Sequence, residues 1–424
     1  MNLSEHLAKL SLLIQENSQN NTQVLTEAKG HLDHPEDLVF INGGEGAKRA
    51  LAAIESAMRE PEKFTIKWDG YPALIFGRGT DGRFICVDKH MFNRADGSGR
   101  KVYSPQQFIK YDTDRGVIRS QLHRTIPAIW RALERADTKK TGFYWGDLIF
   151  DTPLQVQRDG LYHFQANPNG IRYTLEPEKF KQATGIELDD KIAGIAVHQY
   201  LDPNAPQRAA EESARTGEKI APTDMSRSLD GTLGNLRNVD NVAIIPSKMP
   251  ITPRIRVPTA LLTKARDAVT SYNANIDTFF QNSTQYQSRK AFGEHFTKYV
   301  NRRIVGGSLD NLVNGFIEYM NTVNMTSSMR AKLMGTDQQD KNGRVIHRPG
   351  YIDGNMPALK EIFSVWIALY NLKNAVVKQL QKAADNAPVQ GYLQDGRKSQ
   401  EGFVSHGLKF IDRLGFSAQN LGGR

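Results

Sequence analysis

The sequence predicts an α+β protein, with antiparallel sheets and flanking helices plus a mostly helical domain or insertion. Short apolar runs bounded by glycine, proline and polar turn residues recur between Phe64 and Leu201, as is typical of strands in antiparallel sheets. From Pro258 to about Ala387 the pattern changes to long helical periodicity. Strand-like runs return in the last segment, Gly391–Arg424. We therefore expect sheet-forming sequence on both sides of a helical block.

Local patterns predict the elements of the sheet-forming part. Helices are expected at Leu3–Leu13, at Ala47–Met58 and, with an interruption near Pro127, at Val117–Ala136. Strands are expected at Phe64–Ile66, Ala73–Gly77, Arg83–Val87, Gly142–Phe150, Leu161–Phe164, Ile171–Leu175 and Ile192–Leu201. The polar stretch Ala205–Asp224 is expected to form an exposed loop or a short solvated helix.

Composition excludes several classes of protein. At 424 residues the chain is too long for one ordinary core and suits two or three domains. Its one cysteine, Cys86, excludes a disulfide framework and a cysteine-rich zinc site. No stretch reaches the ~18 apolar residues of a membrane span, and Met1–Gln19 lacks a signal-peptide core, so we expect a soluble cytoplasmic protein. The formal charge of +9 suits a polyanionic partner such as nucleic acid.

The sharpest local signal is a lysine at the end of a predicted strand, in Phe64–Gly70 (FTIKWDG). Lys67 is followed by an aspartate and a glycine, Asp69 and Gly70. A lysine attacks phosphorus only as the free amine, so its pKa of about 10.4 must be lowered by burial or by neighbouring cations. Gly70 lets the backbone turn close to a nucleotide. The pattern fits a nucleophilic lysine; a lysine–aspartate pair on a hairpin is the simpler structural alternative.

Two further segments supply carboxylates and cations. Phe143–Phe150 carries Asp147 in an apolar, aromatic strand, where a carboxylate is costly unless it is hydrogen-bonded or faces a cation or a ribose hydroxyl. Glu401 begins another strand, and a tight His406-Gly407 turn leads to a second strand that contains Lys409. Antiparallel pairing of these strands would set cations for a phosphate chain beside carboxylates for a metal.

These segments together resemble the covalent nucleotidyltransferases, the superfamily of ATP-dependent DNA and RNA ligases and mRNA-capping enzymes. Lys67–Gly70 is similar to the nucleophile motif Lys-x-Asp-Gly, and Tyr144–Asp147 to the aromatic-x-Gly-Glu motif, with Asp in place of Glu. Glu401–Val404 is similar to the Glu-Gly-x-Val motif, and Lys409 to the lysine of the last motif. The resemblance covers roughly residues 60–200 and 395–415.

The resemblance implies an ATP-grasp-like ligase core interrupted by the helical block. The chain would then consist of a first part of the nucleotidyltransferase core at 1–257, a helical domain or insertion at 258–387 and a C-terminal segment at 388–424 that completes the core. Pro72 stands where DNA ligases of this superfamily carry an arginine. Because RNA-sealing members often lack that arginine, Pro72 favours RNA ends.

The resemblance also implies roles for individual residues. The implied catalytic residues are Lys67, Asp69, Glu401 and Lys409. The implied nucleotide-binding residues are Ile66, Gly70, Lys89, Asp147 and His198, and the implied Mg²⁺ ligands are Asp147 and Glu401. Three assignments have rivals in the sequence: Arg94 for Lys89, Tyr200 for His198, and Asp230 with Lys248 for Glu401 with Lys409.

The implied activity is the ATP-dependent joining of polynucleotide ends. Lys67 would attack the α-phosphate of ATP, giving a lysyl-AMP and pyrophosphate. The AMP would pass to a 5′-phosphate, and a 3′-hydroxyl would then displace it and seal the strand. RNA ends are favoured over DNA ends, a monomer is favoured, and no membrane partner is expected. The alternatives are a GTP-preferring capping-type nucleotidyltransferase and a catalytically silent nucleic-acid-binding protein on the same fold.

Overall fold

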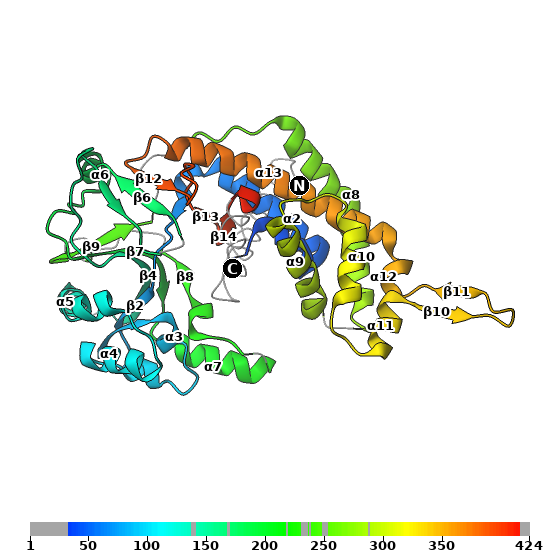
Figure 1. Ribbon diagram of the computed structural model, residues 1–424, viewed down its shortest axis with the longest axis horizontal. Helices are drawn as coiled ribbons and strands as arrows, with labels where there is room; N and C mark the ends of the chain where they lie inside the picture. The colour runs from blue at the N-terminus through cyan, green and yellow to red at the C-terminus, as the bar shows by residue number, and fades with distance from the viewer. Residues whose placement is uncertain are drawn as a thin grey trace, which may run out of the picture. The chain divides into compact units, whose positions relative to one another are not determined.

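The chain is a mixed α+β protein of two compact units, one rich in sheet and one mainly helical. The computed structural model describes residues 33–136, 141–167, 170–217, 219–229, 236, 239–247, 253–286 and 289–415 (Figure 1). In this part of the chain, the sheet unit consists of Thr65–Ile251 and Ala384–Gly407, and the helical unit of Asp33–Phe64, Thr252–Ala383 and Leu408–Arg424. The helix predicted at Leu3–Leu13 lies outside the described residues. No helix among the described residues is long and apolar enough to cross a membrane.

The main sheet of the sheet unit is six-stranded, with the order β3-β2-β4-β7-β8, and β9 also pairs with β7. All of its pairings are antiparallel except that of β7 with β9. The strands are β2 (Ala73–Arg78), β3 (Phe84–Asp88), β4 (Gly142–Phe150), β7 (Ala193–Leu201), β8 (Arg227–Ser228) and β9 (Val242–Pro246). This sheet carries two of the residues that the resemblance assigns to nucleotide binding, Asp147 in β4 and His198 in β7.

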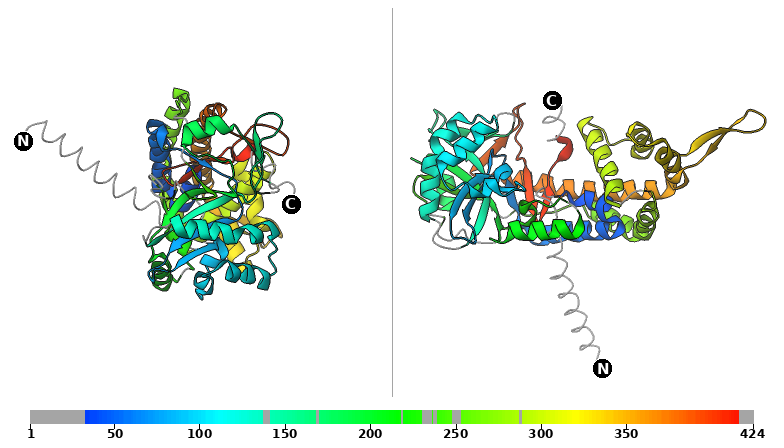
Figure 2. Two further views of the ribbon diagram at one scale, coloured as in Figure 1. Left: turned by 90° about the vertical axis from the view of Figure 1, so that its left-hand side faces the viewer. Right: turned by 90° about the horizontal axis from the view of Figure 1, so that it is seen from below.

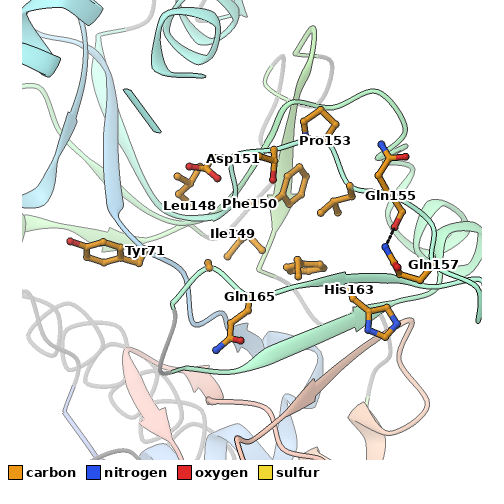
Figure 3. A pocket seen from close by; sticks show the side chains of 14 residues that line it. Tyr71, Leu148, Ile149, Phe150, Asp151, Pro153, Gln155, Gln157, His163 and Gln165 are labelled. Atoms are coloured by element: carbon orange, nitrogen blue, oxygen red, sulfur yellow. Dashed lines mark hydrogen bonds between the residues drawn. The ribbon is translucent and has the colours of Figure 1, made fainter. Parts of the chain in front are cut away.

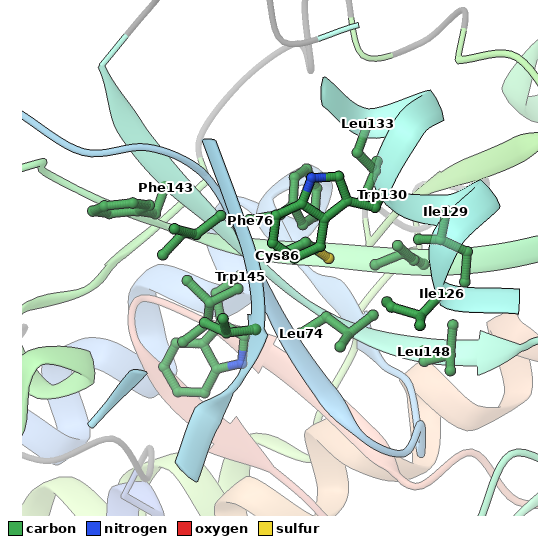
Figure 4. Packing of buried hydrophobic residues seen from close by; sticks show 14 of the residues in the cluster. Leu74, Phe76, Cys86, Ile126, Ile129, Trp130, Leu133, Phe143, Trp145 and Leu148 are labelled. Atoms are coloured by element: carbon green, nitrogen blue, oxygen red, sulfur yellow. The ribbon is translucent and has the colours of Figure 1, made fainter. Parts of the chain in front are cut away.

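Helix α5 (Ser120–Ala136) covers one face of this sheet. Its apolar side chains, among them Ile126 and Trp130, pack against buried sheet residues such as Leu74 and Cys86 (Figure 4). The interruption expected at Pro127 is wrong, because the helix continues through that residue. Apolar positions on both sides of the proline are buried against the sheet, and this packing offsets the hydrogen bond that proline cannot donate.

Two smaller sheets bring the C-terminal part of the chain into the sheet unit. Strand β1 (Thr65–Lys67) pairs antiparallel with β13 (Gly402–Ser405). In the other sheet the order is β12-β6-β5, formed by β5 (Tyr162–Phe164), β6 (Arg172–Leu175) and β12 (Val389–Tyr392). The helices of this unit besides α5 are α3 (Lys89–Phe92), α4 (Pro105–Asp114), α6 (Pro177–Thr184) and α7 (Ala205–Thr216). Helix α7 occupies the stretch expected to be a loop or a short solvated helix.

The helical unit is built mainly from helices. The longer ones are α2 (Leu38–Arg59), α8 (Thr259–Ser283), α9 (Arg289–Val305) and α13 (Met356–Ala384), and the shorter ones are α10 (Leu312–Thr322), α11 (Ser327–Met334) and α12 (Tyr351–Gly354). A two-stranded hairpin, β10 (Thr336–Gln339) and β11 (Val345–Arg348), projects from α11 and α12 (Figure 2). The last strand of the unit is β14 (Leu408–Phe410), which forms a bridge from Leu408 to Asp33.

The boundaries of the helical unit differ from the predicted 258–387. Helix α2 is kinked at Gly43, whose φ is 64°; the segment after the kink contains the helix predicted from Ala47, and a further helical segment precedes it from Leu38. Helix α2 packs against α8 and α9. The ring of Phe40 stacks on those of Phe296 and Trp366, at centroid distances of 5.2 and 6.0 Å. The unit therefore includes residues 33–64, which the sequence assigned to the first part of the core, because the apolar face of α2 is buried among the long helices.

Candidate functional site

The site centres on Lys67 at the end of β1. In the β1–β13 pairing, Lys67 lies opposite Gly402, so the neighbouring Glu401 is placed beside it. The Lys67 Nζ donates a hydrogen bond to Glu401 Oε1 and forms an ion pair with it. The two side chains are only 29% and 13% exposed. On the other edge of β1, Ile66 is buried and its amide donates to the carbonyl of Ser247 at 2.7 Å, which fixes the strand that carries the lysine.

Asp69 is held by hydrogen bonds to β6 and to the loop that precedes it. Its carboxylate accepts hydrogen bonds from the amide of Ile171 at 2.7 Å and from the Asn167 side chain at 3.2 Å. Its own amide donates to the Tyr173 hydroxyl at 2.7 Å. Gly170 is required here, since a Cβ at that position would lie 1.7 Å from Asp69 Oδ2. Asp69 therefore fixes the backbone that follows Lys67.

Gly70 lets this backbone approach β4 closely. A Cβ at Gly70 would lie 2.6 Å from the Cβ of Asp147 and 2.7 Å from the carbonyl oxygen of Leu148. The amide of Tyr71 donates to that same carbonyl at 2.9 Å. The motif glycine thus serves close contact between the Lys67 loop and the strand that carries Asp147.

An irregularity in the β4–β7 pairing aims His198 at Asp147. Gly146 pairs with Val197 but Trp145 pairs with Gln199, so His198 is an extra residue in β7 at this point. Such β-bulges redirect side chains and are frequent beside active sites. The His198 Nε2 lies 3.2 Å from Asp147 Oδ2.

Its rival Tyr200 bonds elsewhere. The Tyr200 hydroxyl donates to the carbonyl of Thr141 at 3.0 Å, and its ring lies 5.6 Å from that of Tyr144. The structure therefore brings His198, and not Tyr200, to Asp147.

The predicted cation Lys89 lies near Asp147 and Trp145. It is the first residue of α3, and its Nζ lies 4.7 Å from the centre of the Trp145 ring. Burial lowers the pKa of Lys89, although the charges of Asp224 and Asp147 oppose the shift. The rival Arg94 instead pairs with Asp96 at 2.8 Å on the surface.

The carboxylates keep the Lys67 amine protonated. Burial by itself would lower the pKa of Lys67, but the charges of Glu401, Asp147 and Asp69 outweigh burial and raise this pKa. The lowered pKa expected from the sequence is therefore wrong for the free protein, because the neighbours of the amine are carboxylates and not cations. Burial raises the pKa of Glu401 to about 7, an effect that Asp69 and Asp147 reinforce and Lys67 opposes.

The donor set fits a divalent cation that shares its ligands with a substrate. Glu401 Oε2 is buried and has no hydrogen-bond partner among the described residues. In those residues no group of three or more His, Cys, Asp or Glu side chains is close enough to bind a metal by itself. Mg²⁺ commonly takes one or two carboxylates and completes its shell with water and substrate phosphates. Glu401 and Asp147 are the carboxylates that would hold it.

Lys409 belongs to the helical unit, where its amide donates to the carbonyl of Asp33 at 2.9 Å. Its role beside Lys67 stays a prediction. The competing residues Asp230 and Lys248 lie outside the described residues. The preceding turn is confirmed, since His406 and Gly407 both have positive φ values, 51° and 70°.

Sequence reasoning missed the residues that support the site. Trp145 contacts both Lys89 and His198, with its ring 5.5 Å from that of the histidine. Asn167 and Tyr173 form hydrogen bonds with Asp69, but neither residue lies in a recognisable sequence motif. Only Trp145 could have been found, since it lies inside the aromatic motif that contains Asp147.

Comparison with known proteins gives one match. A family model described as "Family of unknown function (DUF6267)" matches residues 29–423, which include the described parts of both units. No curated protein and no solved structure matches the chain. The chemistry must therefore be inferred from the geometry of the site.

Proposed function

We propose that the chain, which belongs to the DUF6267 family, is an ATP-dependent polynucleotide ligase that acts through a lysyl-AMP intermediate. The proposed substrates are 5′-phosphate and 3′-hydroxyl ends, with RNA ends favoured over DNA ends. ATP and Mg²⁺ are the proposed cofactors, and nucleic acid is the proposed partner.

The observation that supports this proposal is the gathering of three carboxylates around one lysine. Lys67 and Glu401 are 334 residues apart in sequence, yet the β1–β13 register joins them. Asp69 and Asp147 act on the same amine. A structural ion pair needs one carboxylate, and further buried negative charge costs stability. This excess of negative charge around a lysine is typical of a functional site.

The residues are suited to the first chemical step. The Lys67 Nζ would form a bond to the α-phosphorus of ATP while the bond from that phosphorus to the bridging oxygen breaks and pyrophosphate leaves. Lys67 must first lose a proton, and the Glu401 carboxylate already contacts Nζ and is placed to accept it. When bound, Mg²⁺ would supply positive charge that offsets the negative charge of the phosphates and carboxylates. Lys89 is a further cation for the phosphate chain.

Covalent labelling tests the proposal. Incubation with α-³²P-ATP and Mg²⁺ should leave label on the protein after denaturing electrophoresis, and Lys67→Ala should abolish it. Lys110→Ala is the matched control, because Lys110 is exposed and forms a surface ion pair with Asp114 in α4. A wild-type protein that never labels contradicts the proposal.

The acceptor is tested in a second experiment. The labelled protein should seal 5′-phosphorylated RNA to a 3′-hydroxyl end more efficiently than the matched DNA. Stronger labelling by GTP than by ATP, without sealing, would support the capping-type alternative. Salt-sensitive binding of nucleic acid without any labelling would support the catalytically silent alternative.

A further inference from the structure

A pocket opens in the sheet unit beside the end of β4 (Figure 3). Its volume is about 340 Å³, and it is lined by Tyr71, by residues 148–155 and 157, and by residues 163–166. This volume is at the lower end of the range for small-molecule sites and would admit one planar ring system. Two large apolar side chains, Tyr71 and Val156, are 55% and 53% exposed at or next to this lining.

The lining selects for a neutral, planar, hydrogen-bonding group. Of the described residues that line the pocket, none is a lysine or arginine, and Asp151 would repel a phosphate. Gln155 and Gln157 carry amides that both donate and accept hydrogen bonds. The exposed ring of Tyr71 offers a surface for stacking, and the ring of Phe164 adds an aromatic wall. Amides combined with aromatic rings are the groups that bind unstacked nucleobases.

The pocket shares its framework with the Lys67 loop. Tyr71 directly follows Gly70, and its amide is bonded to the carbonyl of Leu148 in the pocket wall. The ring of Phe164 stacks at 5.4 Å on that of Tyr173, whose hydroxyl accepts from the amide of Asp69. A group held in the pocket is therefore positioned by the same residues that position the lysine loop.

We propose that this pocket binds one unpaired nucleobase of the polynucleotide substrate. A base inside a duplex is stacked and paired on both sides and cannot enter such a pocket without being flipped out. This inference rests on the proposed function. It specifies the substrate class as single-stranded or frayed polynucleotide ends, in preference to fully paired ends.

Oligonucleotide binding without ATP tests this inference. The probe is a 5′-phosphorylated RNA 10-mer with 2-aminopurine near its 5′ end, either single-stranded or annealed to its complement. In titrations, the full-length protein should bind the single strand about tenfold more tightly than the annealed duplex. The fluorescence of 2-aminopurine in the single strand should be quenched as the base stacks in the pocket. The variants Tyr71→Ala and Gln155→Glu should each weaken this binding about tenfold.

The controls separate this inference from the proposed function. Tyr71 and Gln155 are both exposed, so circular dichroism should confirm that the variants fold. Ile118→Ala removes another exposed apolar side chain of the same unit, 85% exposed, and should bind like wild type. Equal binding of paired and unpaired probes, or wild-type affinity in both pocket variants, would overturn the inference even if the protein labels with ATP. Unpaired-base binding by a protein that never labels would support the pocket while refuting the ligase.

Discussion

The charge on Lys67 determines whether the proposed chemistry can start. Its pKa is raised by Glu401, Asp147 and Asp69, so at neutral pH very little of the amine is neutral and able to attack phosphorus. Neutralising any of these carboxylates, by a cation or by substitution, lowers that pKa. In the proposed reaction, Lys67 would therefore become reactive only when positive charge arrives with the substrate.

Replacing Glu401 by Gln should increase the reactivity of Lys67 toward acetic anhydride at a fixed pH. The variant removes one of the charges that raise the pKa of the amine, and a pKa lower by one unit gives about ten times more neutral amine. Peptide mass spectrometry measures acetylation at Lys67. Acetylation of the exposed Lys110 should not change.

The same variant should label poorly with ATP, because it would also lose the proposed Mg²⁺ ligand and proton acceptor. Unchanged or slower acetylation of Lys67 in the variant would contradict the assignment of Glu401 as the group that keeps the amine charged.

His34 should make the helical unit sensitive to acid. Burial lowers its pKa well below the usual value of about 6.5, and the charges of Arg413, Lys373 and Lys409 add to the shift. Below pH 6.5 the unfolded chain therefore binds a proton that the folded state does not, so stability falls as the pH falls. The free energy of unfolding should decrease by up to about 1.4 kcal/mol per pH unit from this residue. Urea denaturation at several pH values measures it, and His34→Gln should flatten the slope.

At the scale of elements, the contact between the Lys67 loop and β4 depends on a glycine. Gly70→Ala should reduce ATP labelling by about 100-fold or more, because the added Cβ displaces the loop from Asp147 and a shift of ~1 Å is enough for such a loss. It should also destabilise the protein by about 1–3 kcal/mol through overpacking. Labelling rates and urea midpoints measure the two effects.

Gly354→Ala is the matched control for this substitution. A Cβ at Gly354, in α12, meets no atom within 4 Å, so both labelling and stability should stay near wild type. Wild-type labelling by the Gly70 variant would show that the close approach of loop and strand is not needed.

Local patterns predicted the strands between residues 64 and 201 well, since each of the seven predicted strands agrees with the structure to within one residue at either end. Alternating burial and turn residues are local signals. The pairing of distant strands is not local. The bulge that points His198 toward Asp147 depends on the register between β4 and β7. Because this register cannot be read from local sequence, Tyr200 remained an alternative to His198. The hairpin β10–β11 was missed although Asn342-Gly343 is a strong turn signal, because it lies within a helical pattern.

At the scale of the whole molecule, segments close to the C-terminus complete structures begun much earlier. Strand β13 completes the pairing of β1, and β12 completes that of β6. The motifs could be found in the sequence because their chemistry is local, whereas the unit boundaries could not. The local sequence around α2 and Arg413 does not indicate that they belong to the helical unit. They belong to it because of the residues that they contact, which are distant in sequence.

Arg413 shows how strongly the helical unit depends on its last described residues. Its guanidinium donates to Asp37 at 2.8 Å, to Glu36 at 3.2 Å and to the Asn301 side chain at 2.5 Å, and all of these contacts are buried or partly buried. Lys373 also pairs with Glu36, at 3.1 Å. Removing the guanidinium would leave buried carboxylates with too little positive charge.

Arg413→Ala should therefore lower the free energy of unfolding by about 3–5 kcal/mol, the usual cost of breaking a buried ion pair from one side. Urea denaturation followed by circular dichroism measures the change. Arg397→Ala is the control, because Arg397 pairs with Asp395 at the surface with 59% of its side chain exposed, and such pairs contribute ~1 kcal/mol or less. If both variants lose the same small amount of stability, the ion pairs of Arg413 with Glu36 and Asp37 contribute little, and the helical unit must be stabilised by its aromatic packing instead.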